Sequence, residues 1–129
     1  MIKKELNKLF APTSYWTASE EKKKEVANGC GPDGWKTFWG INKTFGLSIK
    51  KACNIHDWMY HFGKNQEDKD KADRVFLNNM IRIIETETSW RWLSKLRCFK
   101  ARLYYLATKC FGGPAFWEGK NNPDELNKT

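Results

Sequence analysis

Apolar side chains recur at helical spacing along most of the chain, and three long segments show this pattern. Residues 49–62 form one stripe of Ile49, Ala52, Cys53, His56, Met59 and Tyr60. Residues 66–87 form a second stripe of Asp73, Phe76, Leu77, Met80 and Ile84. Residues 89–110 form a third run with Trp90, Leu93, Leu96, Arg97, Tyr104 and Leu106. Since one apolar face is typical of a helix that packs on a core, the sequence predicts an all-α fold.

The remaining segments predict smaller elements. Residues 1–10 have the pattern of a short amphipathic helix, and Ser19 has the chemistry of an N-cap for a helix that ends at Gly29. Residues 28–46 hold five of the nine glycines, with several aromatic residues, and predict an ordered loop. Ser48 is expected to cap the helix over residues 49–62, and Gly63 to end it. No strand signal is strong, but a small hairpin over 35–46 or 111–119 stays open.

Length and charge set the broad class of protein. A chain of 129 residues predicts one domain over 1–129, with a polar, flexible tail from 120. There are 23 basic and 15 acidic residues, so the net charge of +8 favours anionic partners such as nucleic acid or an anionic membrane surface. No stretch reaches the roughly 20 apolar residues of a transmembrane helix. We see no signal peptide and expect a protein made in the cytoplasm and then released or delivered, as an effector, a toxin or a phage-type component.

Four cysteines, at positions 30, 53, 98 and 110, allow three disulfide pairings. The absence of a CxxC pair and the presence of only two histidines argue against structural zinc. Cys98 and Cys110 fall on one predicted helix, where 12 residues span about 18 Å, so these two are not expected to pair.

The first two long helices are joined by a short turn near Lys64 and Asn65, so they predict an antiparallel hairpin. His56 and Asp73 lie at equal distances from this turn, and each is on the apolar stripe of its helix. A carboxylate on a core-facing stripe needs a partner, so we expect the two side chains to meet. Such a pair combines a general base with an orienting carboxylate. Asp70, one turn nearer the loop, is the alternative partner.

Asp57 follows His56 and projects about 100° away around the helix. It can therefore face the glycine-rich loop, where Gly29, Gly31 and Gly34 allow backbone carbonyls to bend inward. Carboxylate and carbonyl oxygens are the ligands that Ca²⁺ prefers, so this loop is a candidate calcium site. The alternative is an ordinary glycine turn beside a solvated carboxylate.

Together these motifs resemble the secreted-type phospholipase A2 family. NGCGPDGW resembles its calcium loop, CNIHDWMY its C-x-x-H-D-x-x-x-Y helix, and ADRVFLNNM the D-x-x-F stretch of its bacterial and fungal branch. The resemblance covers residues 28–80, within a motif-bearing core of about 28–84. The short interval from His56 to Asp73 suits the compact variants of the family. A phospholipase A2-like fold, with the site on an antiparallel helix pair, is therefore expected.

The resemblance implies a role for each matching residue. His56 is similar to the catalytic base, Asp73 to its partner, and Tyr60 to a tyrosine that binds this aspartate. Cys30 and Cys53 match a cysteine pair that forms a disulfide in the family. The implied calcium ligands are Asp57 and the carbonyl groups of Gly29, Gly31 and Asp33, and the Gly31 N–H would help to hold the oxyanion.

The implied activity is calcium-dependent hydrolysis of the sn-2 ester of glycerophospholipids at an anionic membrane surface. Lysines and tryptophans near the site suit such docking, although Trp35, Trp39 and Trp58 are equally suited to core packing. Three other functions compete. A silent phospholipase-fold module would bind lipid or nucleic acid without turnover. A basic nucleic-acid-binding helical protein would leave the register of His56 and Asp73 unexplained. A His-Asp phosphohydrolase would need a further histidine ligand, and the only other histidine is His61.

Overall fold

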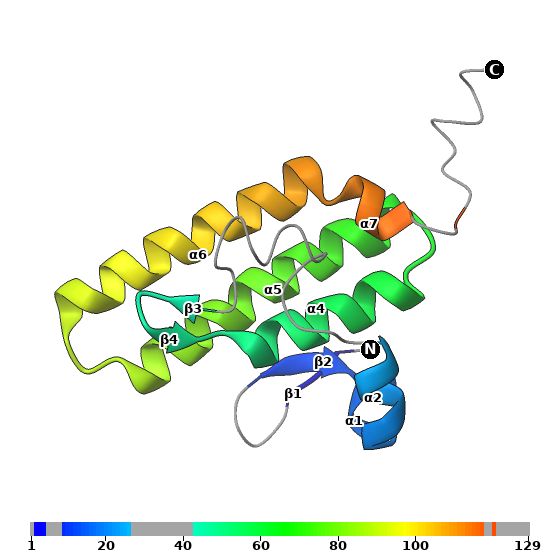
Figure 1. Cartoon of the computed structure of the whole chain (residues 1–129), viewed down its shortest axis with the longest axis horizontal. Helices are drawn as coiled ribbons and strands as arrows, with labels where there is room; N and C mark the ends of the chain where they lie inside the picture. Colours follow the sequence, from blue (N-terminus) through cyan, green and yellow to red (C-terminus); the bar gives the residue numbers. More distant parts are fainter. Residues whose placement is uncertain (1, 5–8, 27–42, 118–119, 121–129) are drawn as a thin grey trace.

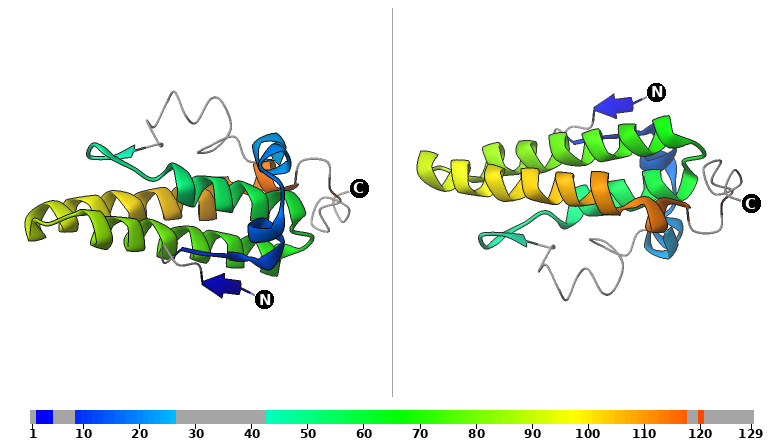
Figure 2. Two further views of the ribbon diagram at one scale, coloured as in Figure 1. Left: turned by 90° about the horizontal axis from the view of Figure 1, so that it is seen from below. Right: turned by 90° about the horizontal axis from the view of Figure 1, so that it is seen from above.

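Three long helices dominate the part of the chain that the structure describes. The structure is a computed structural model, and it describes residues 2–4, 9–26, 43–117 and 120. Helices α4 (Lys50–Phe62), α5 (Gln66–Glu87) and α6 (Arg91–Phe111) run alongside one another, as Figures 1 and 2 show. The described residues are mostly helical, in agreement with the predicted all-α class. None of these helices is both long enough and apolar enough to cross a membrane.

Local signals set the ends of the helical hairpin. Helix α4 ends at Gly63, whose N–H donates a 2.9 Å hydrogen bond to the carbonyl of Met59. Asn65 caps α5, because its side-chain oxygen accepts a 2.8 Å hydrogen bond from the Asp68 N–H. Ser48 is not the cap of α4: that position falls to Ile49, and the Ser48 hydroxyl only receives the Lys50 N–H at 3.3 Å. The two-residue link Lys64–Asn65 then makes α4 and α5 antiparallel neighbours.

The predicted helix over residues 1–10 is wrong. Strand β1 (Ile2–Lys4) instead pairs with β2 (Phe10–Pro12) in antiparallel register. The cause is a tertiary contact with α5, in which buried Asn79 binds the backbone of Phe10 twice. The Phe10 N–H donates to Asn79 Oδ1 at 2.7 Å, and Asn79 Nδ2 donates to the Phe10 carbonyl at 2.8 Å. These bonds fix an extended backbone where the apolar spacing alone favours a helix.

The other short elements lie around the helical layer. Helix α1 (Thr13–Thr17) precedes α2 (Glu20–Val26), whose first turn is capped as predicted because the Ser19 hydroxyl accepts the Lys22 N–H at 3.2 Å. A tight hairpin joins β3 (Lys43–Thr44) to β4 (Leu47–Ser48), and both residues at its tip have positive φ. Residues 43–46 of this hairpin fall within the first of the two segments left open for a hairpin, 35–46, of which residues 35–42 lie outside the described residues. The second segment contains a helix, α7 (Gly113–Trp117).

The described residues form two hydrophobic clusters, and Ile83 packs against both. One joins α4, α5 and α6 through Ile49, Ala52, Cys53, Phe76, Met80, Ile84, Ala101 and Tyr104. The other joins α4 and α5 to the β2 segment and α7. Its residues are Leu9, Ala11, Ile55, Met59, Tyr60, Ala72, Val75 and Phe116. The first two predicted stripes are buried, except for Leu77, which is half-buried. The third differs, since Tyr104 is buried while Trp90, Leu96 and Leu106 are exposed.

Candidate active site

The helical hairpin brings His56 of α4 and Asp73 of α5 together. His56 Nε2 lies 2.8 Å from Asp73 Oδ1, and the two side chains are only 8% and 1% exposed. This is the pairing that the distances from the turn predict. Asp70 lies elsewhere, because it accepts a 2.9 Å hydrogen bond from Gln66 Nε2 on the exposed side of α5. The partner of His56 is therefore Asp73 and not Asp70.

Two further donors reach the same carboxylate. The Tyr60 hydroxyl donates to Asp73 Oδ1 at 2.6 Å, and the Lys69 ammonium donates to Asp73 Oδ2 at 2.9 Å. Tyr60 was expected here from its family resemblance, but sequence reasoning missed Lys69. The available signal was its spacing, since residues four apart share one helix face and Lys69 precedes Asp73 by one turn. Both oxygens of Asp73 are thus engaged by hydrogen bonds.

The end of α6 closes over this group. Lys69 Nζ also donates to the carbonyl groups of Thr108 at 3.0 Å and Lys109 at 3.4 Å, so the last turn of α6 helps to bind the lysine charge. Gly112 lies against Tyr60, and a Cβ at this position would come within 2.6 Å of the Tyr60 hydroxyl. Only a residue without a side chain fits there. The aspartate and its donors are consequently held between three helices.

Burial and charge fix the protonation states of the group. His56 is stacked against the Phe76 ring, with ring centres 4.6 Å apart, and burial lowers its pKa despite the neighbouring Asp73. Burial alone would raise the pKa of Asp73, but the hydrogen bonds and charge from His56, with those from Tyr60 and Lys69, hold it below its usual value. Burial also raises the pKa of Tyr60, so this phenol stays protonated and donates. At neutral pH a neutral imidazole therefore faces an ionised carboxylate.

One nitrogen of His56 is left for chemistry. Because Nε2 is engaged by Asp73, the imidazole carries its hydrogen there and its lone pair on Nδ1. Within the described ranges, His56 forms no second hydrogen bond. The residue retains 7% exposure, so a small opening reaches it. The arrangement can accept one proton at Nδ1 and stabilise the resulting imidazolium through Asp73.

Two side chains with oxygen atoms, Asn54 and Asp57, come shortly before and directly after His56 on α4. Asp57 is half-buried, and Asn54, three residues earlier, lies on a neighbouring part of the same helix face. Among the described residues, the Asn54 Oδ1 atom is buried and accepts no hydrogen bond, so a cation could satisfy it. The other expected calcium ligands, at Gly29, Gly31 and Asp33, lie outside the described residues, as does the Gly31 N–H. Within the described part of the chain, no group of three His, Cys, Asp or Glu side chains could hold a metal.

The structure describes three of the four cysteines and one of the three tryptophans considered for core packing, Trp58. Cys53 is disulfide-bonded, while Cys98 and Cys110 are free. Cys30, its expected partner, lies outside the described residues. Trp58 is only 3% exposed, and its indole N–H donates to the Ser14 hydroxyl at 3.2 Å. Core packing is therefore the correct interpretation of Trp58, and Trp35 and Trp39 lie outside the described residues.

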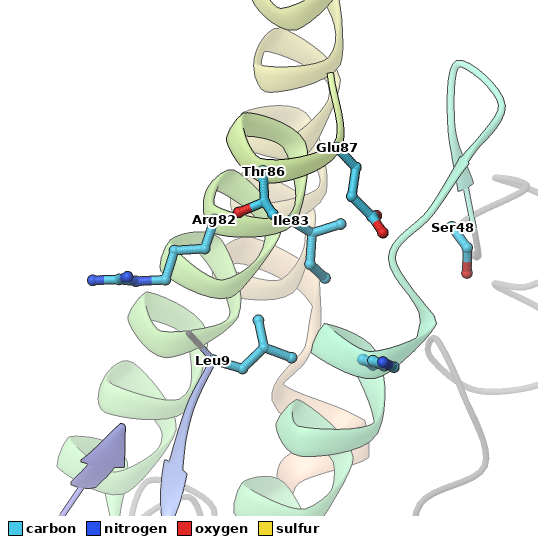
Figure 3. A pocket seen from close by; sticks show the side chains of 7 residues that line it. Leu9, Ser48, Arg82, Ile83, Thr86 and Glu87 are labelled. Atoms are coloured by element: carbon cyan, nitrogen blue, oxygen red, sulfur yellow. The ribbon is translucent and has the colours of Figure 1, made fainter. Parts of the chain in front are cut away.

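A cavity of about 350 Å³ lies away from this group, between α4, α5 and the residue before β2. Figure 3 shows the side chains of Leu9 and Ile83 in the space between α5 and α4, while the Arg82 side chain points away from it. Its remaining lining residues are Ser48, Lys51, Thr86 and Glu87. None of the residues that bind Asp73 lines it, so it is separate from the candidate active site.

Comparison with known proteins gives one match. A family model described as "Protein of unknown function (DUF1353)" matches residues 8–94, about two thirds of the chain, and this range contains His56, Tyr60, Lys69 and Asp73. No curated protein matches the chain. No solved structure matches it either.

Proposed function

For this chain, which belongs to the DUF1353 family of proteins of unknown function, we propose calcium-dependent hydrolysis of the sn-2 ester of glycerophospholipids. One observation carries the proposal: a buried, neutral histidine is held by an ionised aspartate through Nε2 while Nδ1 is left to accept a proton. The fold we propose is phospholipase A2-like, on the strength of the antiparallel helix pair that carries this group. The motifs quoted from residues 28–80 support the same assignment.

The chemistry follows from the two nitrogens of His56. Nδ1 takes a proton from a water molecule while the water oxygen bonds to the carbonyl carbon of the ester. The negative charge of Asp73, 2.8 Å from Nε2, stabilises the imidazolium that forms. The tetrahedral intermediate then expels the glycerol oxygen, which takes the proton back from Nδ1. The products are a fatty acid and a lysophospholipid.

The donors around Asp73 keep the pair in its active arrangement. The Tyr60 hydroxyl, from α4, donates a hydrogen bond to Asp73 Oδ1, and the Lys69 ammonium donates to Asp73 Oδ2. Because both oxygens have partners, the carboxylate cannot rotate away from the imidazole without losing hydrogen bonds. This role resembles the fixing of the imidazole by an aspartate in other hydrolytic sites. We regard Tyr60 and Lys69 as positioning residues rather than catalytic ones.

Calcium would be held by Asp57 and the glycine-rich loop, with Asn54 Oδ1 as a further oxygen nearby. When bound, it would neutralise the substrate phosphate and polarise the ester carbonyl. Asp57 would then contribute to holding the cation, while His56 would activate the water.

The test is fatty-acid release from mixed liposomes by the purified chain, with calcium or with a chelator. We expect release only with calcium. His56→Gln should reduce the rate by about 10² to 10⁴-fold, the usual contribution of general acid–base catalysis. His61→Gln is the matched control, because His61 is exposed on the same helix. If His56→Gln and His61→Gln are folded and equally active, the proposal is rejected.

A further inference from the structure

Helix α6 has a second apolar face that nothing in the described structure covers. Five of its residues are exposed and follow each other at intervals of four and three: Trp92, Leu96, Phe99, Leu103 and Leu106. At about 100° per residue they form a band about 80° wide, on the side of α6 opposite buried Ala101. We call this band the α6 stripe. It runs along a helix that packs mainly on α5 (Figures 1 and 2).

The charges beside the α6 stripe have one sign. The 21 residues of α6 include six basic and no acidic residues. Arg97 turns inward to the Phe45 carbonyl and the Thr88 hydroxyl. The other five flank the stripe or lie near it: Arg91, Lys95, Lys100, Arg102 and Lys109. An apolar band edged by lysine and arginine is typical of a helix that lies in the interface of an anionic membrane.

We infer that the α6 stripe is the surface by which this protein docks on anionic phospholipid bilayers. Charge complementarity selects this partner, because a second copy of α6 would place basic edges against basic edges. Trp92 near the start of the helix also suits the boundary between lipid and water. Lysine and arginine edges can reach the headgroups while their stems cover apolar surface. The inference rests on the proposed function, because that function makes phospholipid the substrate. The inference itself concerns only how the protein binds the bilayer.

The experiment measures co-sedimentation of the full chain with vesicles in chelator, so that no lipid is hydrolysed. Vesicles of equimolar phosphatidylcholine and phosphatidylglycerol are compared with phosphatidylcholine alone. We expect strong binding to the anionic vesicles, reduced at least about tenfold by Phe99→Gln because a large apolar contact is lost. The control is Phe62→Gln, a similarly exposed phenylalanine on α4, and it should bind like the wild type.

Charge is tested by a second matched pair. Lys95→Glu with Arg102→Glu should weaken binding at least about tenfold, since each basic residue near the surface adds to the attraction. Lys71→Glu with Arg74→Glu, on the exposed side of α5, changes the net charge equally and should have a smaller effect. If both double variants weaken binding equally, the effect is one of total charge and the docking surface is wrong.

Two other results would also overturn the inference. One is unchanged vesicle binding by Phe99→Gln. The other is a wild-type dimer that Phe99→Gln converts to a monomer without any change in vesicle binding, which would make the stripe an interface between copies. A chain that docks through α6 but releases no fatty acid would reject only the hydrolysis. A chain that hydrolyses detergent-dispersed phospholipid but docks elsewhere would reject only the surface.

Discussion

Asp73 keeps a negative charge where water scarcely reaches it, and three donors make this possible. If the carboxylate orients His56, Asp73→Asn should preserve the shape but lower the rate of ester hydrolysis strongly, because an amide can favour the wrong tautomer of the imidazole. Calcium affinity should barely change, since Asp73 is not a proposed ligand. The assay is fatty-acid release together with calcium titration calorimetry.

Asp70→Asn is the control for that experiment. Asp70 lies one turn away and pairs only with Gln66 among the hydrogen bonds described for it, so its loss should be nearly silent. If Asp70→Asn lowers the rate of fatty-acid release strongly and Asp73→Asn lowers it little, the partner of His56 is Asp70 instead.

Lys69 binds Asp73 and the last turn of α6, a role that was not predicted from the amino-acid sequence. Lys69→Met should keep the aliphatic volume but remove the lysine donor from Asp73 Oδ2 and from the carbonyls of Thr108 and Lys109, of which Thr108 keeps the Gly112 N–H. We expect a loss of about 2–4 kcal/mol in the free energy of unfolding, as for other broken buried charge pairs. Urea denaturation measures it, and the ¹⁵N shifts of the His56 ring report whether the imidazole has lost its orientation.

Lys71→Met provides the comparison, because Lys71 is exposed two residues away on the same helix. It should change stability by less than about 0.5 kcal/mol. If the two variants are equally stable, the Lys69–Asp73 contact contributes nothing.

At the level of elements, Asn79 joins the N-terminal strand to α5. Asn79→Leu removes both hydrogen bonds between the Asn79 side chain and the backbone of Phe10. The N–H and carbonyl of Phe10 then lose these partners. We expect a cost of about 2–4 kcal/mol. Urea denaturation should show it, and amide exchange at Phe10 should accelerate. Asn78→Leu, at the exposed neighbouring position, should have little effect on either measurement.

The helices and their apolar faces could be predicted because the information is local. The stripes of α4 and α5 and the short turn between them were enough to place His56 opposite Asp73. The strand at Phe10 was not predictable in this way, because its cause is a side chain 69 residues away. Lys69 was missed because it lies in a run of charged residues that has the composition of a solvated surface. The exposed stripe of α6 was hidden for a related reason: apolar spacing does not distinguish a face that meets the core from one that does not.

For the whole molecule, the low pKa of Asp73 makes stability depend on pH. An aspartate in the unfolded chain titrates near about 3.9, and the folded value lies lower, so the unfolded chain binds more protons in this window. The stabilisation is therefore present above about pH 4 and is lost as the pH falls through the folded pKa. In chelator, the difference in unfolding free energy between wild type and Asp73→Asn should shrink below about pH 4. A difference that grows on acidification would contradict the assigned charge.

Calcium should stabilise the whole fold. A ligand that binds only the native state raises the free energy of unfolding, by about 2.7 kcal/mol at 100 times its Kd, and the melting temperature rises with its concentration. Asp57→Asn should lose most of this stabilisation, as measured by thermal melts with and without calcium. Asp68→Asn, on α5, removes the same charge and should retain the shift. An unchanged shift in Asp57→Asn would exclude Asp57 as a ligand.

The two members of the catalytic pair are separated by only 17 residues along the chain. Closing so short a loop costs little entropy, and helical hairpins form rapidly. His56 should therefore meet Asp73 as soon as α4 and α5 associate, early in folding. The bond from Lys69 to Thr108 spans 39 residues and can form only after α6 has docked. A nascent chain would thus hold the pair, with Lys69 already bonded to Asp73 within α5, before the last long helix supplies its carbonyl groups to the lysine.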